Sequence, residues 1–178
     1  MNSSVSFPLA PLSPALKIIT GLLCALPLLF IILAITLQLP VFWLTAAGLG
    51  ILYALVWQWC RPTAFVITPE HLSITFPRWQ RRIPLSTIVD VRRVDMATFA
   101  QEYGFALRVG VGGLWGGFGW LWTTRKGWVE FYISRQDRFT LVLRNTGLPL
   151  LISPEPGAEF VETLQQYLGG SSTPDRSI

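Results

Sequence analysis

The feature that most constrains this chain is a run of 43 residues, 18–60, without a charged side chain. The hydrocarbon core of a bilayer is about 30 Å thick, and about 20 apolar residues in a helix cross it. The run therefore accommodates two spans, and the Gln-Leu-Pro sequence at 38–40 supplies the turn between them. We predict helices at about 16–37 and 41–59, because irregular backbone is not tolerated in contact with lipid.

A cleaved signal peptide is the alternative interpretation of the first apolar segment. Such a peptide carries basic residues before an apolar stretch of about 7 to 15 residues. Residues 1–16 contain no basic side chain, and the apolar stretch is longer. Lys17 lies at the upstream end of the first span, several arginines follow the second, and the turn carries no charge, so the positive-inside rule predicts that both termini are cytoplasmic.

Small residues recur at intervals of four in both predicted spans, a spacing that lets membrane helices approach closely. They are Gly21 and Ala25 in the first span and Ala46, Gly50 and Ala54 in the second. The hairpin can close on itself through these residues, and the same stripes can equally serve a homo-oligomer. No charge lies between Lys17 and Arg61, which argues against a channel or transporter that works by itself.

The residue inventory leaves little for catalysis. The chain has one histidine and two cysteines, too few for a zinc cluster or a disulfide framework. His71 lies beside Glu70 in a predicted turn, and no nucleophile-elbow or metalloprotease motif is present. We therefore expect no catalytic residue, no metal and no cofactor. An enzyme is favoured only if His71 folds into a cleft beside a serine and a carboxylate.

The pattern changes after Thr63 to short β-branched and aromatic runs separated by Pro, Gly and charged turns, which is typical of strands. The predicted strands are 64–68, 72–76, 80–83, 88–94, 105–111, 128–134, 139–144 and 150–153. A helix is predicted from about Ser153 to Gly169, and its apolar face is expected to cover an open end of the sheet. That face comprises Phe160, Val161, Leu164, Tyr167 and Leu168. Residues 1–15 are interpreted as a polar, proline-rich segment and 169–178 as a disordered tail.

Four stretches of this region resemble the bacterial PH domain family. They begin with Phe-Val-Ile-Thr-Pro-Glu-His-Leu-Ser-Ile at 65–74 and continue at 82–91, 108–120 and 151–162. The resemblance implies a membrane α-helical hairpin followed, at 63–168, by a mainly-β domain, a PH-like β-barrel of about seven strands capped by a C-terminal α-helix. It also implies a multi-pass protein of the bacterial cell (inner) membrane.

Phosphoinositide-binding PH domains carry several basic residues in their first hairpin loop. The corresponding loop here reads Thr68-Pro69-Glu70-His71, which departs from that pattern.

A glycine-rich run at 110–119 is the most unusual part of the β-domain. A dinucleotide-binding G-x-G-x-x-G motif starting at Gly110 would need glycine at Trp115, so the spacing does not match. Instead the run interleaves glycine with large apolar rings, and further tryptophans and two basic residues follow by position 126, a composition typical of membrane interfaces. The candidate contact residues are Leu114, Trp115, Phe118, Trp120, Trp122, Arg125 and Lys126. The alternative is that these rings cover the barrel core or its open mouth.

Basic residues follow the spans closely and would be attracted by anionic lipid, or else represent the ordinary positive-inside signal. They are Arg61, Arg78, Arg81 and Arg82. Residues 61–178 carry a net charge of +3, too balanced for a nucleic-acid-binding surface. We expect a module that holds a protein partner at the inner face of the membrane. The alternative is a lipid-contacting, membrane-organising module that uses the aromatic and basic loop.

Overall fold

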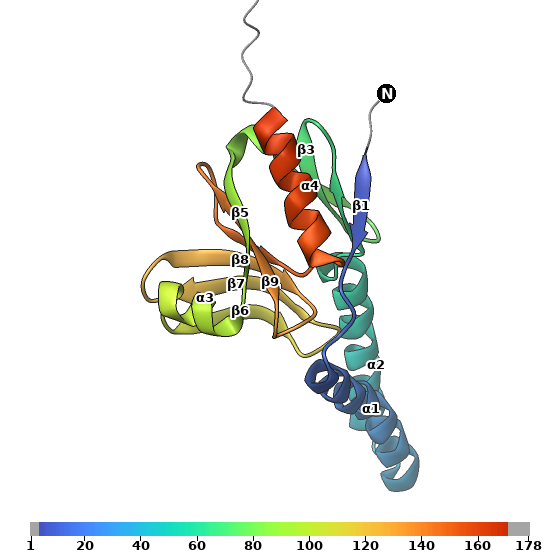
Figure 1. Ribbon diagram of the computed structural model, residues 1–178. Helices are drawn as coiled ribbons and strands as arrows, with labels where there is room; N and C mark the ends of the chain where they lie inside the picture. The colour runs from blue at the N-terminus through green and yellow to red at the C-terminus, as the bar shows by residue number, and fades with distance from the viewer. Residues whose placement is uncertain (1–3, 171–178) are drawn as a thin grey trace, which may run out of the picture.

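The computed structural model describes residues 4–170, in which a helical hairpin projects from a mainly-β domain (Figure 1). Helix α1 spans Pro14–Leu37 and α2 spans Pro40–Leu55, and a π-helical turn, Val56–Cys60, continues α2. Proline occupies the first turn of both helices, where its missing N–H leaves no helical hydrogen bond unmade. Both predicted helices are present, and each is long and apolar enough to cross a membrane.

The first sheet has four antiparallel strands in the order β1-β2-β3-β4. The strands are β1 Val5–Pro8, β2 Ala64–Ile67, β3 His71–Thr75 and β4 Gln80–Pro84. Strand β1 precedes the helical hairpin in the chain and β2 follows it, with Phe7 opposite Phe65. The chain therefore starts in this sheet, leaves it through both helices and returns to it.

The second sheet has six strands in the order β5-β9-β10-β8-β7-β6. They are β5 Ile88–Val94, β6 Ala106–Gly112, β7 Gly117–Thr123, β8 Gly127–Ile133, β9 Phe139–Arg144 and β10 Leu150–Ile152. A short 3-10 helix, Leu85–Thr87, leads from β4 into β5. Strands β8 and β10 are parallel, and the other pairs are antiparallel.

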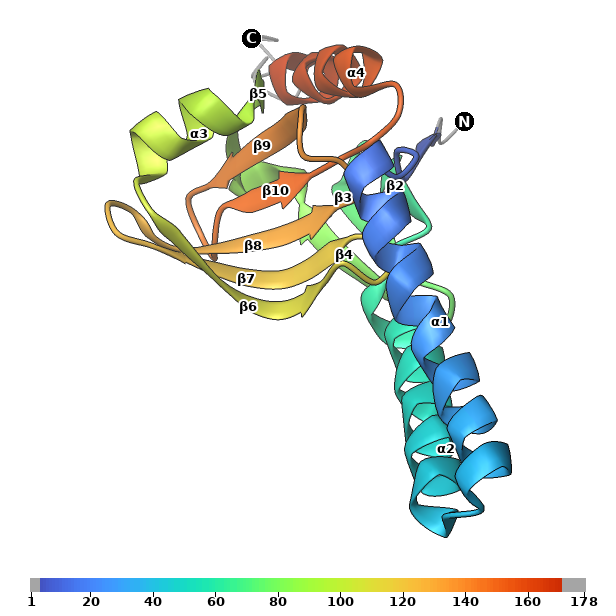
Figure 2. The same cartoon turned by 90° about the horizontal axis from the view of Figure 1, so that it is seen from below.

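Two apolar cores lie on opposite faces of the six-stranded sheet. One lies between the two sheets and includes the predicted apolar face of the C-terminal helix α4, Gly157–Gly170. The ring of Phe160 on α4 packs on Phe7 and Phe65 at centroid distances of 5.2 and 6.2 Å. The Gln165 side chain donates to the Val91 carbonyl of β5 at 3.1 Å. Helix α4 thus bridges the two sheets: it lies between β5 and β1 in Figure 1, and Figure 2 shows it beside β5 and β9.

The second core is covered by helix α3, Met96–Tyr103, which the sequence analysis did not predict. The side chain of Asp95 accepts a hydrogen bond from the backbone N–H of Thr98 at 2.7 Å and so caps the helix. Phe99 and Tyr103 then point into the core, where their rings stack at 4.4 Å.

The prediction of a β-barrel with about seven strands needs correction. Residues 4–170 form ten strands in two sheets, and no ladder joins β4 to β5 or β1 to β6, so the sheets do not close. Two of the extra strands have clear origins. Strand β1 comes from the segment before the helices, and β7 forms within the run that the sequence analysis treated as a loop. The predicted disordered tail at 169–178 begins inside α4, because Gly169 and Gly170 are the last two residues of that helix. Residues 171–178 and 1–3 lie outside the described part of the chain.

Candidate membrane-proximal surface

The glycine and tryptophan run is a β-hairpin whose tip reaches the helices. Strands β6 and β7 pair along their full length, and the turn closes with the Gly113 N–H donating to the Gly116 carbonyl at 2.9 Å. Gly113 has a φ of +93°, and a Cβ atom there would lie 2.7 Å from a methyl carbon of Ile19 on α1. Glycine is therefore required at this position both by the turn and by its approach to the helix.

One hydroxyl on α1 satisfies two backbone groups of this tip. Thr20 Oγ1 donates to the Gly113 carbonyl at 2.6 Å and accepts from the Trp115 N–H at 3.1 Å. The Trp115 ring packs edge-on against Trp57 and Tyr53 of the second helical segment, at 4.9 and 6.2 Å. The tip thus contacts both helices and fixes the β-domain against the domain-side ends of the hairpin.

These contacts divide the predicted contact residues into four groups. Leu114 and Phe118 are buried inside the protein, and Trp115 is partly covered by the helices. Trp120 and Trp122 are exposed on strand β7 rather than in a loop. Arg125 and Lys126 lie at the opposite end of β7, in the turn before β8. The run is therefore not one loop that could enter a bilayer as a unit.

The two basic residues of the far turn interact with helix α3. Arg125 donates to the Gln101 carbonyl, and Lys126 Nζ lies 3.3 Å from a carboxylate oxygen of Glu102. The Lys126 ammonium also lies 4.6 Å from the Tyr103 ring centroid. Both side chains have a structural role in holding α3 against this turn.

The predicted juxtamembrane arginines also separate. Arg61 lies over the Trp57 ring at 4.4 Å, and burial lowers the pKa of its guanidinium. Arg78 and Arg82 are exposed on the β3–β4 hairpin. Arg81 instead reaches inward to the carboxylate of Glu130 on β8.

Glu130 is a buried carboxylate between two arginines. The Tyr132 hydroxyl donates to Oε1 at 2.7 Å, the atom that Arg81 also contacts, and Arg144 Nη2 lies 3.6 Å from Oε2. Burial lowers the pKa of Arg144, whereas burial and the Glu130 charge raise the pKa of Tyr132. Tyr132 therefore remains a protonated donor to Glu130. The cluster satisfies a charge that would otherwise be unpaired in the core.

A mostly apolar pocket of about 300 Å³ adjoins this cluster and separates the end of the second helix from the six-stranded sheet. Its wall includes Trp59, Phe76, Trp79 and Trp120. Phe76 and Trp79 stack at 4.1 Å, and the Trp79 indole N–H donates to the Trp59 carbonyl at 3.1 Å. Trp120 on the sheet therefore lies beside the last turn of the second helix.

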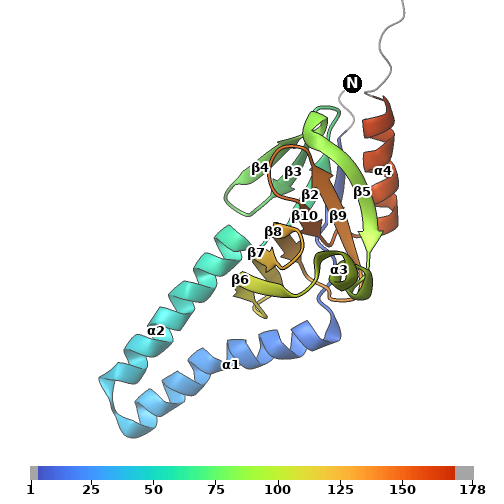
Figure 3. The same ribbon diagram turned by 90° about the vertical axis from the view of Figure 1, so that its left-hand side faces the viewer.

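Trp120 belongs to a larger exposed surface on three strands, which we call the β6–β8 apolar face. Register pairs place Val109 opposite Trp120, Leu107 opposite Trp122, and Trp122 opposite Trp128. Paired residues point to the same side of a sheet, so the five side chains share one face. Each is between 42% and 55% exposed. Figures 1 and 3 show β6, one of the two edge strands of this sheet, on the side from which the helices project.

The predicted contact residues did not include Leu107, Val109 and Trp128, although Leu107 and Val109 occur in the period-two alternation of an exposed strand face. The residues predicted to pack the two helices together differ in burial. Ala46 is buried, whereas Gly21, Ala25, Gly50 and Ala54 face outward from the hairpin. A Cβ atom added at Gly21 or Gly50 would meet no other atom within 4 Å.

His71 lies at the start of β3, where its Nδ1 atom is 3.1 Å from the Thr68 hydroxyl. Among residues 4–170, no three His, Cys, Asp or Glu side chains are grouped so that they could hold a metal ion.

Two sheets bridged by a C-terminal helix form a mainly-β domain, which carries a hairpin of two helices that are long and apolar enough to cross a membrane. The family model for the bacterial PH domain matches residues 63–168, more than half of the chain, and the chain belongs to this family. No curated protein and no solved structure matches the chain. PH domains are generally non-catalytic binding modules.

Proposed function

We propose that this protein is a membrane-anchored, non-catalytic PH-like module that lies with its β6–β8 apolar face against the lipid surface of the inner leaflet. The observation that carries the proposal is the position of that face. Its five apolar side chains are exposed on strands at the helix side of the domain. Water-exposed apolar surface of this extent commonly marks a site of protein or membrane contact.

Continuity with the helix ends favours lipid as the occupant. Trp57 and Trp59 are exposed in the last turn of the second helix, and Trp59 shares a pocket wall with Trp120. Trp79 is also exposed beside them. Tryptophan concentrates at the headgroup level of a bilayer, because its ring is apolar and its N–H is polar. The helix ends and the sheet face would then form one aromatic surface at that level.

The attachment of the domain supports the same orientation. Only Arg61, Pro62 and Thr63 separate the second helix from β2, and the hairpin tip is bonded to Thr20 of α1. A domain held at two places cannot rotate freely about its tether. The β6–β8 apolar face would therefore remain near the bilayer instead of sampling all directions.

A second candidate function is recruitment of a protein partner, and the open edge of β6 favours it. Strand β6 has a partner on one side and none of the described strands on the other. Such an edge can accept an extended segment by backbone hydrogen bonds, with neighbouring apolar side chains providing specificity.

Spin labels on the full chain in nanodiscs test the first proposal. In a background with Cys24→Ser and Cys60→Ser, labels are placed at L107C and W122C on the face. Val89→Cys is the matched control, since Val89 is 66% exposed on the distant strand β5. Lipid contact predicts that labels at 107 and 122 are reached well by oxygen and poorly by a water-soluble nickel complex, and the reverse at 89.

Equal accessibility at all three positions would contradict lipid contact. Poor access of both reagents at 107 and 122 would mean that protein covers the face. In purified nanodiscs that protein is a second copy of this chain. In native membranes a crosslinker at 122 that captures one stoichiometric protein would instead support partner recruitment.

A further inference from the structure

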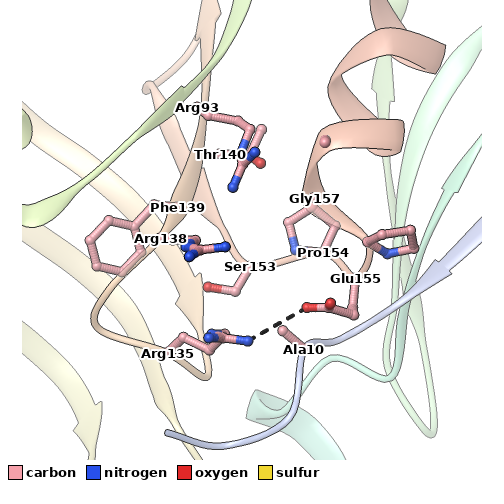
Figure 4. Close-up of a pocket in the computed structure, with 12 residues that line it drawn as sticks. Ala10, Arg93, Arg135, Arg138, Phe139, Thr140, Ser153, Pro154, Glu155 and Gly157 are labelled. Carbon is pink, nitrogen blue, oxygen red and sulfur yellow. Dashed lines mark ion pairs between the residues drawn. The ribbon is translucent and has the colours of Figure 1, made fainter.

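A second pocket lies away from the β6–β8 apolar face, at the N-terminal end of α4, and Figure 4 shows it with its lining side chains. Its volume is about 190 Å³, smaller than the roughly 300–1,000 Å³ of typical pockets for drug-sized ligands. Residues from four distant chain segments line it: Ala10, the end of β5, the β8–β9 loop and the turn before α4. The pocket therefore has room for a small group rather than a nucleotide.

Three arginines from two of these segments line the pocket. Arg135 is held by Asp137, with nitrogen–oxygen distances of 2.7 and 2.9 Å, and lies 3.8 Å from Glu155. For Arg93 and Arg138, the described residues provide no carboxylate within salt-bridge distance. Asp95 and Asp137 line an adjoining pocket with these two arginines and balance part of their charge. A bound anion would reduce the remaining repulsion between the guanidinium groups.

The first turn of α4 adds backbone donors to these charges. An α-helix leaves its first N–H groups without intrahelical partners, and its dipole favours negative charge there. Gly157 and Ala158 both line the pocket, and the space where a Cβ of Gly157 would lie is open. A helix N-terminus that faces two arginines without a salt bridge to any described residue is an arrangement that suits an oxyanion.

Ser153 provides an independent indication of a ligand. The residue is 2% exposed, its N–H donates to the Tyr132 carbonyl and its carbonyl accepts from the Ala10 N–H. Its hydroxyl is buried and has no hydrogen-bond partner. Figure 4 shows that hydroxyl directed into the space between Arg135 and Arg138. A buried hydroxyl without a partner is costly, and an anion in the pocket would accept its hydrogen bond.

We propose that this pocket binds a phosphate-type oxyanion, held by Arg93 and Arg138, the Ser153 hydroxyl and the first N–H groups of α4. The Glu155 carboxylate, which lines the pocket beside Arg135, limits the site to one small anionic group. A free phosphate ester and a lipid headgroup present the same chemistry to these donors.

The test is a titration of the full chain in detergent with inorganic phosphate, in which sodium chloride keeps the ionic strength constant. The melting temperature is measured at each phosphate concentration. We expect saturable stabilisation of the unaltered protein. Arg138→Gln and Ser153→Ala should each weaken the apparent phosphate affinity about tenfold or more, because each removes a hydrogen bond to a charged group. The S153A change removes a buried unpartnered hydroxyl, so it should leave the fold intact.

Arg78→Gln is the matched control, since Arg78 is an exposed arginine in the β3–β4 turn, and it should titrate like the unaltered protein. Absence of saturable stabilisation, or equal titration of R138Q and R78Q, would overturn the proposal. Repeating the titration in phosphatidylglycerol nanodiscs separates the two sources. Persisting stabilisation indicates a free phosphate compound. If added phosphate does not change the melting temperature in nanodiscs, and if R138Q lowers the melting temperature in nanodiscs but not in detergent, the lipid headgroup occupies the pocket.

Discussion

The Thr20 hydroxyl on α1 satisfies two backbone groups of the β6–β7 hairpin tip. It donates to the Gly113 carbonyl and accepts from the Trp115 N–H. Thr20 is buried, on a helix that is otherwise mostly apolar. Polar groups in such surroundings are costly unless they are paired. Thr20 therefore carries a structural role that the apolar sequence around it does not reveal.

We predict that Thr20→Val, which preserves shape but removes the hydroxyl, lowers the free energy of unfolding by about 1–3 kcal/mol, because two backbone groups lose their partner. The measurement is denaturant unfolding of the full chain in detergent. Thr45→Val is the control, since the Thr45 hydroxyl donates to the Val41 carbonyl of its own helix at 2.9 Å and is exposed. Equal losses for T20V and T45V would show that the tip contact contributes no specific stability.

At the scale of elements, helix α3 is attached to β5 by a bidentate ion pair. Arg92 Nη1 and Nη2 donate to the two carboxylate oxygens of Glu102 at 2.8 and 2.6 Å. Hydrogen bonding from Arg92, with a further contribution from Lys126, holds the pKa of Glu102 below its ordinary value of 4.5. The ion pair therefore attaches α3, which covers the second core, to the six-stranded sheet.

The lowered pKa predicts a pH dependence of defined sign. A carboxyl group with a lowered folded-state pKa contributes stability that is present above its ordinary pKa and is lost as the pH falls through the lowered value. The difference in melting temperature between the unaltered protein and E102Q should therefore be largest near neutral pH and shrink below about pH 4. Glu162→Gln, at an exposed position on α4, is the control. A difference that stays constant down to acid pH would contradict this role of Glu102.

The elements differ in how well the sequence predicts them, for physical reasons. An uncharged run of 43 residues allows few structures other than two helices, and the apolar face of α4 repeats with the period of a helix. Strand β7 was missed because Gly117 and Gly119 lack side chains and hide the alternation of Phe118, Trp120 and Trp122. Strand β1 has four residues, and its partner β2 begins more than 50 residues later, so no local pattern indicates it.

The candidate site was only partly predictable for a related reason. The sequence identified Trp120 and Trp122, but it grouped them with Leu114, Trp115 and the far-turn basic residues because all are neighbours in the chain. The register of β6, β7 and β8 instead places Trp120 and Trp122 beside Leu107, Val109 and Trp128. Register depends on pairing between strands, which spacing along one strand does not determine.

At the scale of the whole molecule, the turn at Gln38 lies at the far end of the helices from the β-domain (Figure 3). Helix α2 and its π-helical continuation comprise 21 residues, which extend about 30 Å at 1.5 Å per residue. This length matches the apolar thickness of a bilayer. If both helices span the membrane, Gln38 and Arg78 must lie on opposite sides of it.

We predict that a membrane-impermeant maleimide applied to intact spheroplasts labels Gln38→Cys but not Arg78→Cys, in the background with Cys24→Ser and Cys60→Ser. After membrane disruption both positions should react, because both side chains are exposed. Labelling of position 78 in intact spheroplasts would reverse the predicted orientation. Labelling of both would contradict a spanning hairpin.

Pairing of β1 with β2 means that the helical hairpin is an insertion into a discontinuous β-domain. Pro8 and Ala64 are register partners in adjacent strands, so a short turn could replace everything between them. A water-soluble derivative for crystallography should therefore keep Val5–Pro8 joined by such a linker to Ala64, since a truncation starting at residue 63 would discard Phe7 from the core. The same derivative would uncover the hairpin tip, where Leu114 and Trp115 would need polar replacements. The same topology implies an order of events during synthesis: β1 can pair only after both helices and then β2 have been synthesised.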